Sequence, residues 1–194
     1  MTEFSNADQK ELLTLARNVI RNYLDTQTRT SPGHTNPRFE EKRGVFVTLH
    51  LNGELRGCIG YPLPHKTVSE AVLDNAIAAA FEDPRFPPLS REEFTTIEIE
   101  ISVLTLPVEI KRVEEIAIGR DGIIISKGYN RGLLLPQVPV EQGWNLEQYL
   151  SYGCMKAGLP ADEWRKGVRI ETFQAIVFGE KEGGETIEEG IEKN

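Results

Sequence analysis

A strand pattern that runs into a tight turn constrains this chain more than any other stretch. In the segment Val45–Leu51, large apolar residues alternate with Phe46, Thr48 and His50, a pattern typical of a strand with one buried face. It ends at Asn52-Gly53, the strongest short signal for a two-residue hairpin turn. We therefore predict an antiparallel hairpin whose second strand carries Leu55-Arg56-Gly57-Cys58-Ile59-Gly60.

The second strand of this hairpin carries the best candidate site. In a regular two-residue hairpin Val47 faces Cys58, and His50 projects from the opposite face of the sheet. Arg56 and Cys58 then share a face, separated by roughly 6.6 Å of backbone. A guanidinium at that range favours the thiolate form of a cysteine. Cys58 is thus the candidate nucleophile or transfer thiol, and Arg56 is its candidate cation and anion binder.

The two glycines of the same stretch leave its backbone open. Gly57 and Gly60 carry no side chain that would shield the main chain, which suits a bulge or the close approach of a ligand. Main-chain amides from Gly57 through Ile59 to Gly60 can also stabilise an oxyanion if the local backbone turns them outward. We therefore include these three residues among the candidate ligand-binding residues.

Helical and strand periodicity predict about three main helices and a mixed, largely antiparallel sheet. Apolar residues recur at helical spacing in three main segments, and alternating or short apolar runs mark further strands. The predicted helices cover about Ala7–Leu24, Val68–Phe81 and Asn145–Ala157. The further strands are Glu98–Val103, the hairpin of Ile123–Ser126 with Leu133–Leu135, and Arg169–Phe178. Between the last hairpin and the third helix, residues 135–139 are predicted to be extended, because Pro136 and Pro139 disfavour a helix.

A proline-rich connection follows the second predicted helix. The segment Asp83-Pro84-Arg85-Phe86-Pro87-Pro88 contains three prolines, which force an extended and stiff chain. On the slightly favoured interpretation, Asp83 and Arg85 only form an ion pair that fixes this turn. On the alternative interpretation they line a ligand pocket beside Cys58, together with Gln137.

Length and charge limit the classes of protein to which this chain can belong. A chain of 194 residues buries a core of its own, and we expect one domain over residues 1–180, in one or two lobes. The formal charge of −8 argues against a nucleic-acid backbone as the main partner. The segment Glu180–Asn194 holds six acidic residues and two lysines, so it contributes −4 and leaves −4 for the rest. We expect residues 181–194 to form a flexible, solvated acidic tail.

Cysteine and histidine usage indicates neither a disulfide framework nor a metal site. Cys58 and Cys154 are the two cysteines, and Cys154 is expected to be a small core residue of the third helix. The histidines, His34, His50 and His65, do not combine with the cysteines at ligand spacing, and none is clearly placed as a base for Cys58. We predict no metal. The polar amino terminus and the lack of a long apolar run favour a cytoplasmic protein without a membrane span.

Six ordered segments resemble the AMMECR family, named for a gene product of a human chromosomal region linked to Alport syndrome and elliptocytosis. The resemblance covers about Leu12–Glu180, and the family's signature of six residues occurs here without substitution at residues 55–60. The matching segments are 44–49, 55–60, 83–89, 98–104, 134–138 and 156–160. The resemblance implies an α+β fold in two lobes with the signature near a cleft between them.

The resemblance also implies possible partners, and it leaves the function open. Family members in prokaryotes are associated or fused with dioxygenase-like Memo proteins and radical S-adenosylmethionine enzymes. One hypothesis is a cysteine-dependent enzyme that acts on a small molecule or a protein and works with such partners. The alternative is a non-catalytic binding or adaptor domain, in which the signature is structural and Arg56 pairs with a carboxylate. An RNA-associated regulatory role is the weakest of the three. The sequence identifies no cofactor, substrate or oligomeric state.

Overall fold

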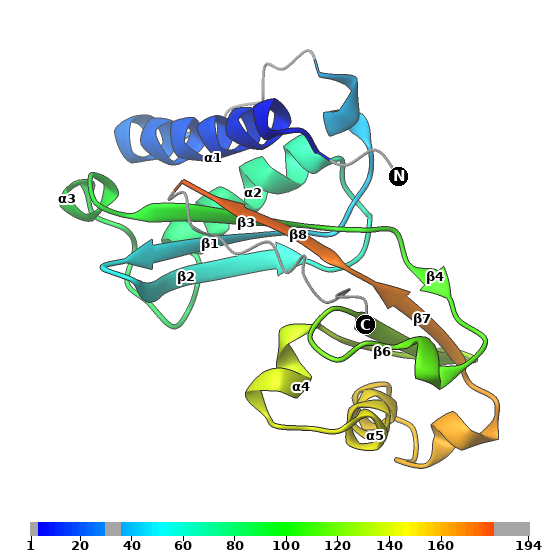
Figure 1. Ribbon diagram of the computed structural model, residues 1–194. Helices are drawn as coiled ribbons and strands as arrows, with labels where there is room; N and C mark the ends of the chain where they lie inside the picture. The colour runs from blue at the N-terminus through cyan, green and yellow to red at the C-terminus, as the bar shows by residue number, and fades with distance from the viewer. Residues whose placement is uncertain (1–3, 30–35, 181–194) are drawn as a thin grey trace, which may run out of the picture. The chain divides into compact units, whose positions relative to one another are not determined.

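The computed structural model describes residues 4–29 and 36–180 and shows an α+β fold (Figure 1). The chain divides into two compact units, one formed by Met1–Leu104 with Ile176–Asn194 and the other by Thr105–Ala175. Each unit contains one four-stranded antiparallel sheet. His34 and the predicted acidic tail of residues 181–194 lie outside the described residues.

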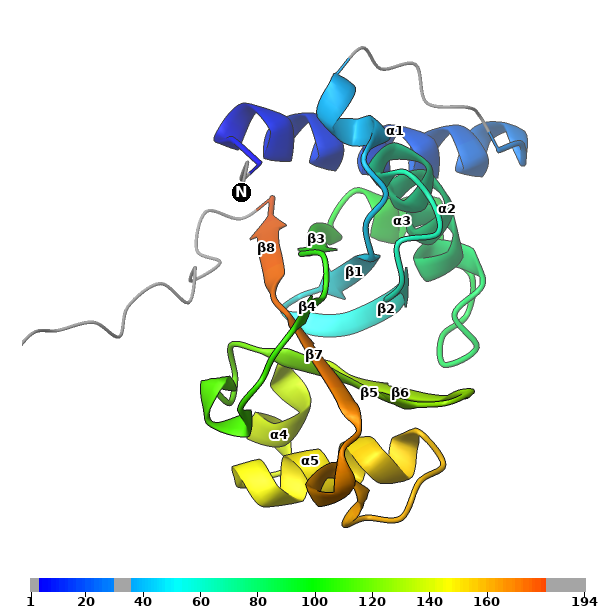
Figure 2. The same cartoon turned by 90° about the vertical axis from the view of Figure 1, so that its right-hand side faces the viewer.

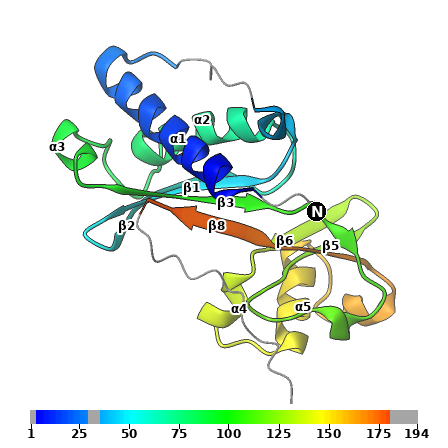
Figure 3. The ribbon, with the colours of Figure 1, turned by 45° about the horizontal axis from the view of Figure 1, so that its top comes forward.

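The first unit is a sheet with helices on one face. Its strand order is β2-β1-β3-β8, which makes β2 and β8 the edges. Figures 1 and 3 show α1 and α2 together on the same side of this sheet. The elements are α1 (Asn6–Thr26), η1 (Pro37–Glu40), β1 (Val45–Leu51), β2 (Glu54–Tyr61), α2 (Val68–Phe81), α3 (Arg91–Phe94), β3 (Glu98–Leu104) and β8 (Ala175–Gly179).

Local sequence explains why the two long helices of this unit begin and pack where they do. Ser5 and Thr67 each cap a helix through a capping box, so the first free amides of α1 and α2 have acceptors. One stripe of α1 is buried against the sheet, whereas α2 is rich in alanine and buried on nearly every side. The buried stripe of α1 contains Leu12, Ala16, Val19 and Ile20. Both predicted helices are confirmed.

The second unit has the same plan on a smaller scale. Its strand order is β4-β7-β5-β6, and α5 packs against β5 and β6, as Figure 2 shows. Tyr149 of α5 is fully buried, and its hydroxyl donates to the carbonyl oxygen of Asp121 at 3.1 Å. Cys154 is buried in the same helix, as predicted. The elements are β4 (Val108–Glu109), η2 (Val113–Glu115), β5 (Gly122–Lys127), β6 (Asn130–Leu134), α4 (Gln137–Glu141), α5 (Leu146–Lys156), η3 (Glu163–Lys166) and β7 (Arg169–Phe173).

Two predicted elements of this region were wrong. Residues 137–141 form the short helix α4, although an extended chain was expected. Pro136 precedes this helix and Pro139 lies in its first turn, where a missing amide hydrogen breaks no helical hydrogen bond. The single strand expected over Arg169–Phe178 is divided at Gln174 into β7 and β8, which belong to different sheets.

None of the helices among residues 4–29 and 36–180 combines the length and the apolar character that crossing a membrane requires.

Gly57 allows β2 to lie directly beneath α2. A Cβ atom at Gly57 would come within 2.1 Å of the carbonyl oxygen of Ala79, an α2 backbone atom that cannot move away alone. At Gly179, near the end of β8, the nearest atom to an added Cβ would be 3.5 Å away, an ordinary contact. The close packing of α2 on the sheet therefore depends on a glycine at position 57.

We predict that Gly57→Ala lowers the free energy of unfolding by about 2 kcal/mol or more, because the added methyl group overpacks a rigid contact. Gly179→Ala is the matched control and should change stability by less than ~0.5 kcal/mol. Urea unfolding followed by circular dichroism measures both variants. Equal stability of the two variants would show that α2 does not approach β2 this closely.

Candidate functional site

A β-bulge at Arg56 sets the geometry of the candidate site. Strands β1 and β2 pair from Leu51 with Glu54, but the register shifts so that His50 faces Leu55 and Leu49 faces Gly57. Arg56 is therefore the extra residue of the second strand. As a result Thr48 lies opposite Cys58, and the expected pairing of Val47 with Cys58 was wrong. Val47 faces Ile59 instead.

The bulge moves Cys58 to the sheet face that points away from the helices. Val47 and Leu49 are buried beneath the helices, so Thr48, between them, projects to the other side. The Thr48 hydroxyl donates to the sulfur of Cys58 at 3.3 Å, and Cys58 is half-buried. His50 shares this face with Thr48, contrary to the expectation that it would oppose Cys58. No hydrogen bond joins His50 to Cys58 in the described chain.

Arg56 is bound to groups other than the thiol. Its side chain is nearly buried, and its Nε and Nη2 atoms donate to the two carboxylate oxygens of Glu93 at 2.8 and 3.0 Å. Nη2 also donates to the carbonyl oxygen of Pro87 at 2.9 Å. The guanidinium carbon lies 5.8 Å from the centre of the Phe86 ring. The positive charge is thus matched by Glu93, and the predicted role of Arg56 toward the Cys58 thiolate stays a prediction.

Asp83 and Arg85 bind the main chain of Cys58. The amide of Cys58 donates to Oδ2 of Asp83 at 2.9 Å, and Nη2 of Arg85 donates to the carbonyl oxygen of Cys58 at 3.2 Å. Nη2 and Nε of Arg85 also donate to Asp83 at 2.7 and 2.9 Å, so the favoured ion pair forms. Because β2 is an edge strand, these two side chains take the place of a neighbouring strand at Cys58.

The charges of this cluster favour ionised carboxylates. Hydrogen bonds from Arg85 hold the pKa of Asp83 well below its usual range, with a smaller contribution from the Cys58 amide. Hydrogen bonds from Arg56 and then from the Ser90 amide lower the pKa of Glu93 from 4.5 to about 2. Burial opposes both shifts. Each carboxylate therefore stays charged at neutral pH and keeps its guanidinium in place.

The other candidate residues divide between core packing and the second unit. Ile59 packs against the core of the first unit, and a Cβ atom at Gly60 would lie 2.2 Å from the ring of Phe46. Gln137 begins α4 in the second unit. Its predicted place beside Cys58, like the ligand-binding roles of the other residues, stays a prediction.

Sequence reasoning missed Glu93, the carboxylate that binds Arg56. A signal was present, because Ser90 and Glu93 have the spacing of a capping box, and the structure shows both of its hydrogen bonds. The carboxylate of Glu93 thus binds the start of α3 and Arg56 at once. Histidine, cysteine and acidic side chains of the described residues form no group of three or more suited to a metal ion.

We predict that Glu93→Gln lowers the free energy of unfolding by about 3 kcal/mol at pH 7, since it leaves the buried Arg56 charge unpaired. Glu92→Gln changes an exposed neighbouring carboxylate and should change stability by less than ~0.5 kcal/mol. A carboxyl group whose pKa is lower in the folded than in the unfolded state stabilises the fold at a pH above its unfolded pKa. This stabilisation is lost as the pH falls through its folded pKa. The difference between wild type and Glu93→Gln should therefore be complete above about pH 4.5 and shrink toward pH 2. Chemical denaturation across this range measures it, and a pH-independent difference would contradict the ion pair.

Comparison with known proteins identifies the family. The family model described as AMMECR1 matches residues 13–178. Protein MJ0810 of Methanocaldococcus jannaschii is 50% identical over 186 residues, covering 91% of this chain and 92% of that protein. Protein Mbar_A1807 of Methanosarcina barkeri is 40% identical over 197 residues, covering 96% and 98%. The crystal structure of the uncharacterized protein PH0010 from Pyrococcus horikoshii matches with a TM-score of 0.72 and 44% identity, covering 89% of this chain and 91% of that one.

The family model and these relatives each match nearly the whole described fold. The chain therefore belongs to the AMMECR1 family.

Proposed function

We propose that this chain is a binding domain in which the signature around Cys58 is a structural device. The observation that carries the proposal is the bidentate ion pair of Arg56 with Glu93, made by a guanidinium whose residue is only 6% exposed. A cation paired in this way contributes to the fold, and its Nη1, which has no partner among the described residues, is buried away from solvent.

The four signature residues that follow Arg56 support the same conclusion, whereas Leu55 is exposed. Gly57 and Gly60 lie against a helix backbone and an aromatic ring, so both positions serve close packing. Ile59 contributes to the core, and the main chain of Cys58 is bound by Asp83 and Arg85. Most of the signature's polar and conformational features therefore have partners within the first unit. A rigid strand of this kind suits a domain that presents a fixed surface to another protein.

The partners that the family resemblance suggests are a Memo-like protein and a radical S-adenosylmethionine protein. Binding to either of them should not need the thiol, because the proposal gives Cys58 no chemical role. It should need the intact fold, because the signature serves to hold β2 in place. These two requirements separate a binding domain from a thiol enzyme.

We predict that the tagged full chain retains a Memo-like or radical S-adenosylmethionine protein from the same genome, and that Cys58→Ala retains it equally well. Arg56→Met, which breaks the ion pair, should reduce both retention and stability, whereas Arg112→Met, at an exposed arginine in the second unit, should reduce neither. Co-purification followed by calorimetric titration measures the binding. The proposal fails if neither protein binds the wild type, or if Cys58→Ala abolishes binding while the fold is intact.

A cysteine-dependent activity is the second candidate, and the exposure of Cys58 favours it. The thiol is half-buried and accepts a hydrogen bond from Thr48, whereas Cys154 is fully buried. Arg85, which is more than half exposed, is the cation bound to the Cys58 main chain. If Cys58 is a nucleophile, Arg85 is therefore the cation that lies at its main chain, with part of its charge offset by Asp83.

For this second candidate we predict that Cys58 reacts with iodoacetamide at pH 7 about tenfold faster than a cysteine in the unfolded chain. Arg85→Gln should remove most of the difference, and Cys58→Ser should abolish the fast reaction, leaving only slow labelling of Cys154. Mass spectrometry of timed samples assigns each label. If Cys58 reacts at the rate of an unfolded thiol and Arg85→Gln changes nothing, Cys58 is not an activated nucleophile.

A further inference from the structure

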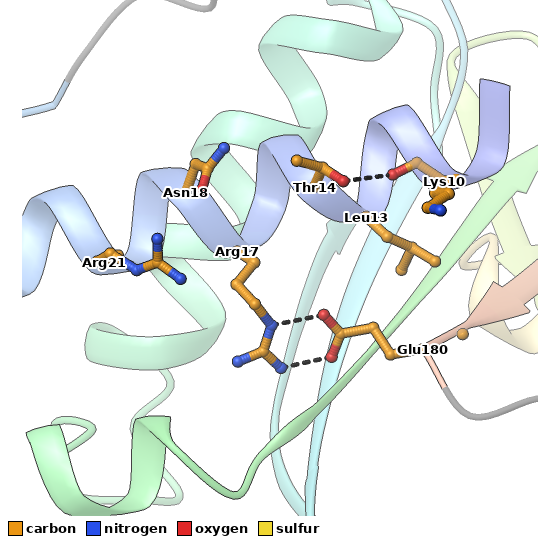
Figure 4. Close-up of a pocket in the computed structure, with 8 residues that line it drawn as sticks. Lys10, Leu13, Thr14, Arg17, Asn18, Arg21 and Glu180 are labelled. Carbon is orange, nitrogen blue, oxygen red and sulfur yellow. Dashed lines mark hydrogen bonds and ion pairs between the residues drawn. The ribbon is translucent and has the colours of Figure 1, made fainter. Parts of the chain in front are cut away.

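A pocket of about 530 Å³ lies in the first unit where α1 meets the end of β8 (Figure 4). Its volume is within the range of sites that bind ligands. The α1 residues that line the pocket recur at helical spacing on the helix face opposite the buried stripe. Glu180, directly after β8, lines the pocket from the facing side. The residues that matter to its chemistry are Lys10, Leu13, Thr14, Arg17, Arg21 and Glu180.

Arg17 and Glu180 form the fixed wall of this pocket. Figure 4 shows the guanidinium of Arg17 facing the carboxylate of Glu180 with two hydrogen bonds, one of them from Nε at 2.5 Å. Arg17 also donates to the carbonyl oxygens of Ile97 at 2.8 Å and Phe94 at 3.2 Å. Its charge and its donors are therefore engaged by the protein, and a ligand would meet the wall without displacing it.

Lys10 and Arg21 are the cations that remain for a ligand. Both are exposed, and neither forms an ion pair with any part of the chain that the structure describes. The guanidinium carbon of Arg21 lies 5.7 Å from the centre of the Phe94 ring, which restricts its direction without neutralising it. With Arg17 matched by Glu180, these two side chains give the pocket a charge of +2 in a chain of charge −8.

We propose that this pocket binds an acidic peptide segment of a partner protein in an extended conformation. Lys10 and Arg21 are eleven residues apart in one helix, which corresponds to roughly 16 Å at 1.5 Å per residue. In an extended peptide only side chains an even number of residues apart share a face, so two acidic residues four apart, about 13 Å at 3.3 Å per residue, suit the long and flexible side chains of Lys10 and Arg21. Two carboxylates at this separation can each meet one cation, and Leu13 offers an apolar contact between them.

Charge favours a short acidic peptide over a nucleic acid. A nucleic-acid strand carries phosphates far beyond two positions, and these would face an acidic protein surface without enough cations to replace the released counterions. A peptide of about five residues meets only the local positive charge. The proposal concerns a surface of α1 that is separate from Cys58, so it goes beyond the binding role assigned to the signature and does not depend on it.

The test measures the binding of a fluorescein-labelled five-residue peptide, with glutamate at both ends and uncharged residues between, to the full chain by fluorescence anisotropy at 50 mM salt. Lys10→Gln with Arg21→Gln should weaken binding roughly fivefold, as expected from the loss of two exposed ion pairs. The matched control is Lys111→Gln with Lys156→Gln, which removes the same charge from exposed lysines of the second unit. The control should bind the peptide within twofold of the wild type. Raising the salt to 200 mM should weaken peptide binding by the wild type more than binding by the Lys10 and Arg21 double variant.

Four results would overturn the proposal. The first is equal binding by wild type and the Lys10 and Arg21 double variant, and the second is equal weakening by the control pair. The third is equally tight binding of a peptide with glutamine at both ends. The fourth is tighter binding of a single-stranded RNA hexamer than of the peptide, which would assign the surface to nucleic acid. Thermal unfolding of both double variants checks that the fold is kept, which is expected because all four side chains are exposed.

Discussion

The outer edge of β2 is closed by two side chains where another strand would otherwise pair. An edge strand exposes amides and carbonyls that need partners, and at Cys58 these partners are the Asp83 carboxylate and the Arg85 guanidinium. Asp83 also binds Arg85, so the loop after α2 is held against the strand by one charged pair. The loop continues through Pro87 to α3, and the carbonyl of Pro87 and the carboxylate of Glu93 in α3 bind Arg56 of the same strand. The signature at residues 55–60 thus connects β2 to α2, to the loop after α2 and to α3.

This arrangement changes the meaning of the signature. A cysteine between glycines with a nearby arginine resembles a nucleophile with its cation, and the sequence alone leaves that interpretation open. In the structure the arginine lies in a bulge and is bound to Glu93, whereas the glycines allow close contact with Ala79 and Phe46. These contacts leave Cys58 half-buried, like Ile59 and Gly60, and Leu55 exposed. A structural role therefore explains more of the signature than catalysis does.

The sequence predicts well the features that depend on local patterns. The hairpin at Asn52-Gly53 and helices α1 and α2 with their capping residues follow from short-range periodicity and side-chain hydrogen bonds. The bulge at Arg56 does not, because the carboxylate that binds its arginine is 37 positions away and no short-range pattern marks the contact. One extra residue was enough to turn Cys58 to the other face of the sheet and to place His50 on the same side. The break at Gln174 was missed for a similar reason, since a change of sheet leaves no mark in alternating residues.

Asp83 binds the amide of Cys58 as a neighbouring strand would. Native-state hydrogen exchange of that amide, followed by nuclear magnetic resonance, tests it most directly. The Cys58 amide of the wild type should be strongly protected, about as well as amides within the β1–β2 ladder, and Asp83→Ala should lose this protection while the ladder stays protected. Exchange of the wild-type Cys58 amide at the rate of an unprotected peptide would contradict it.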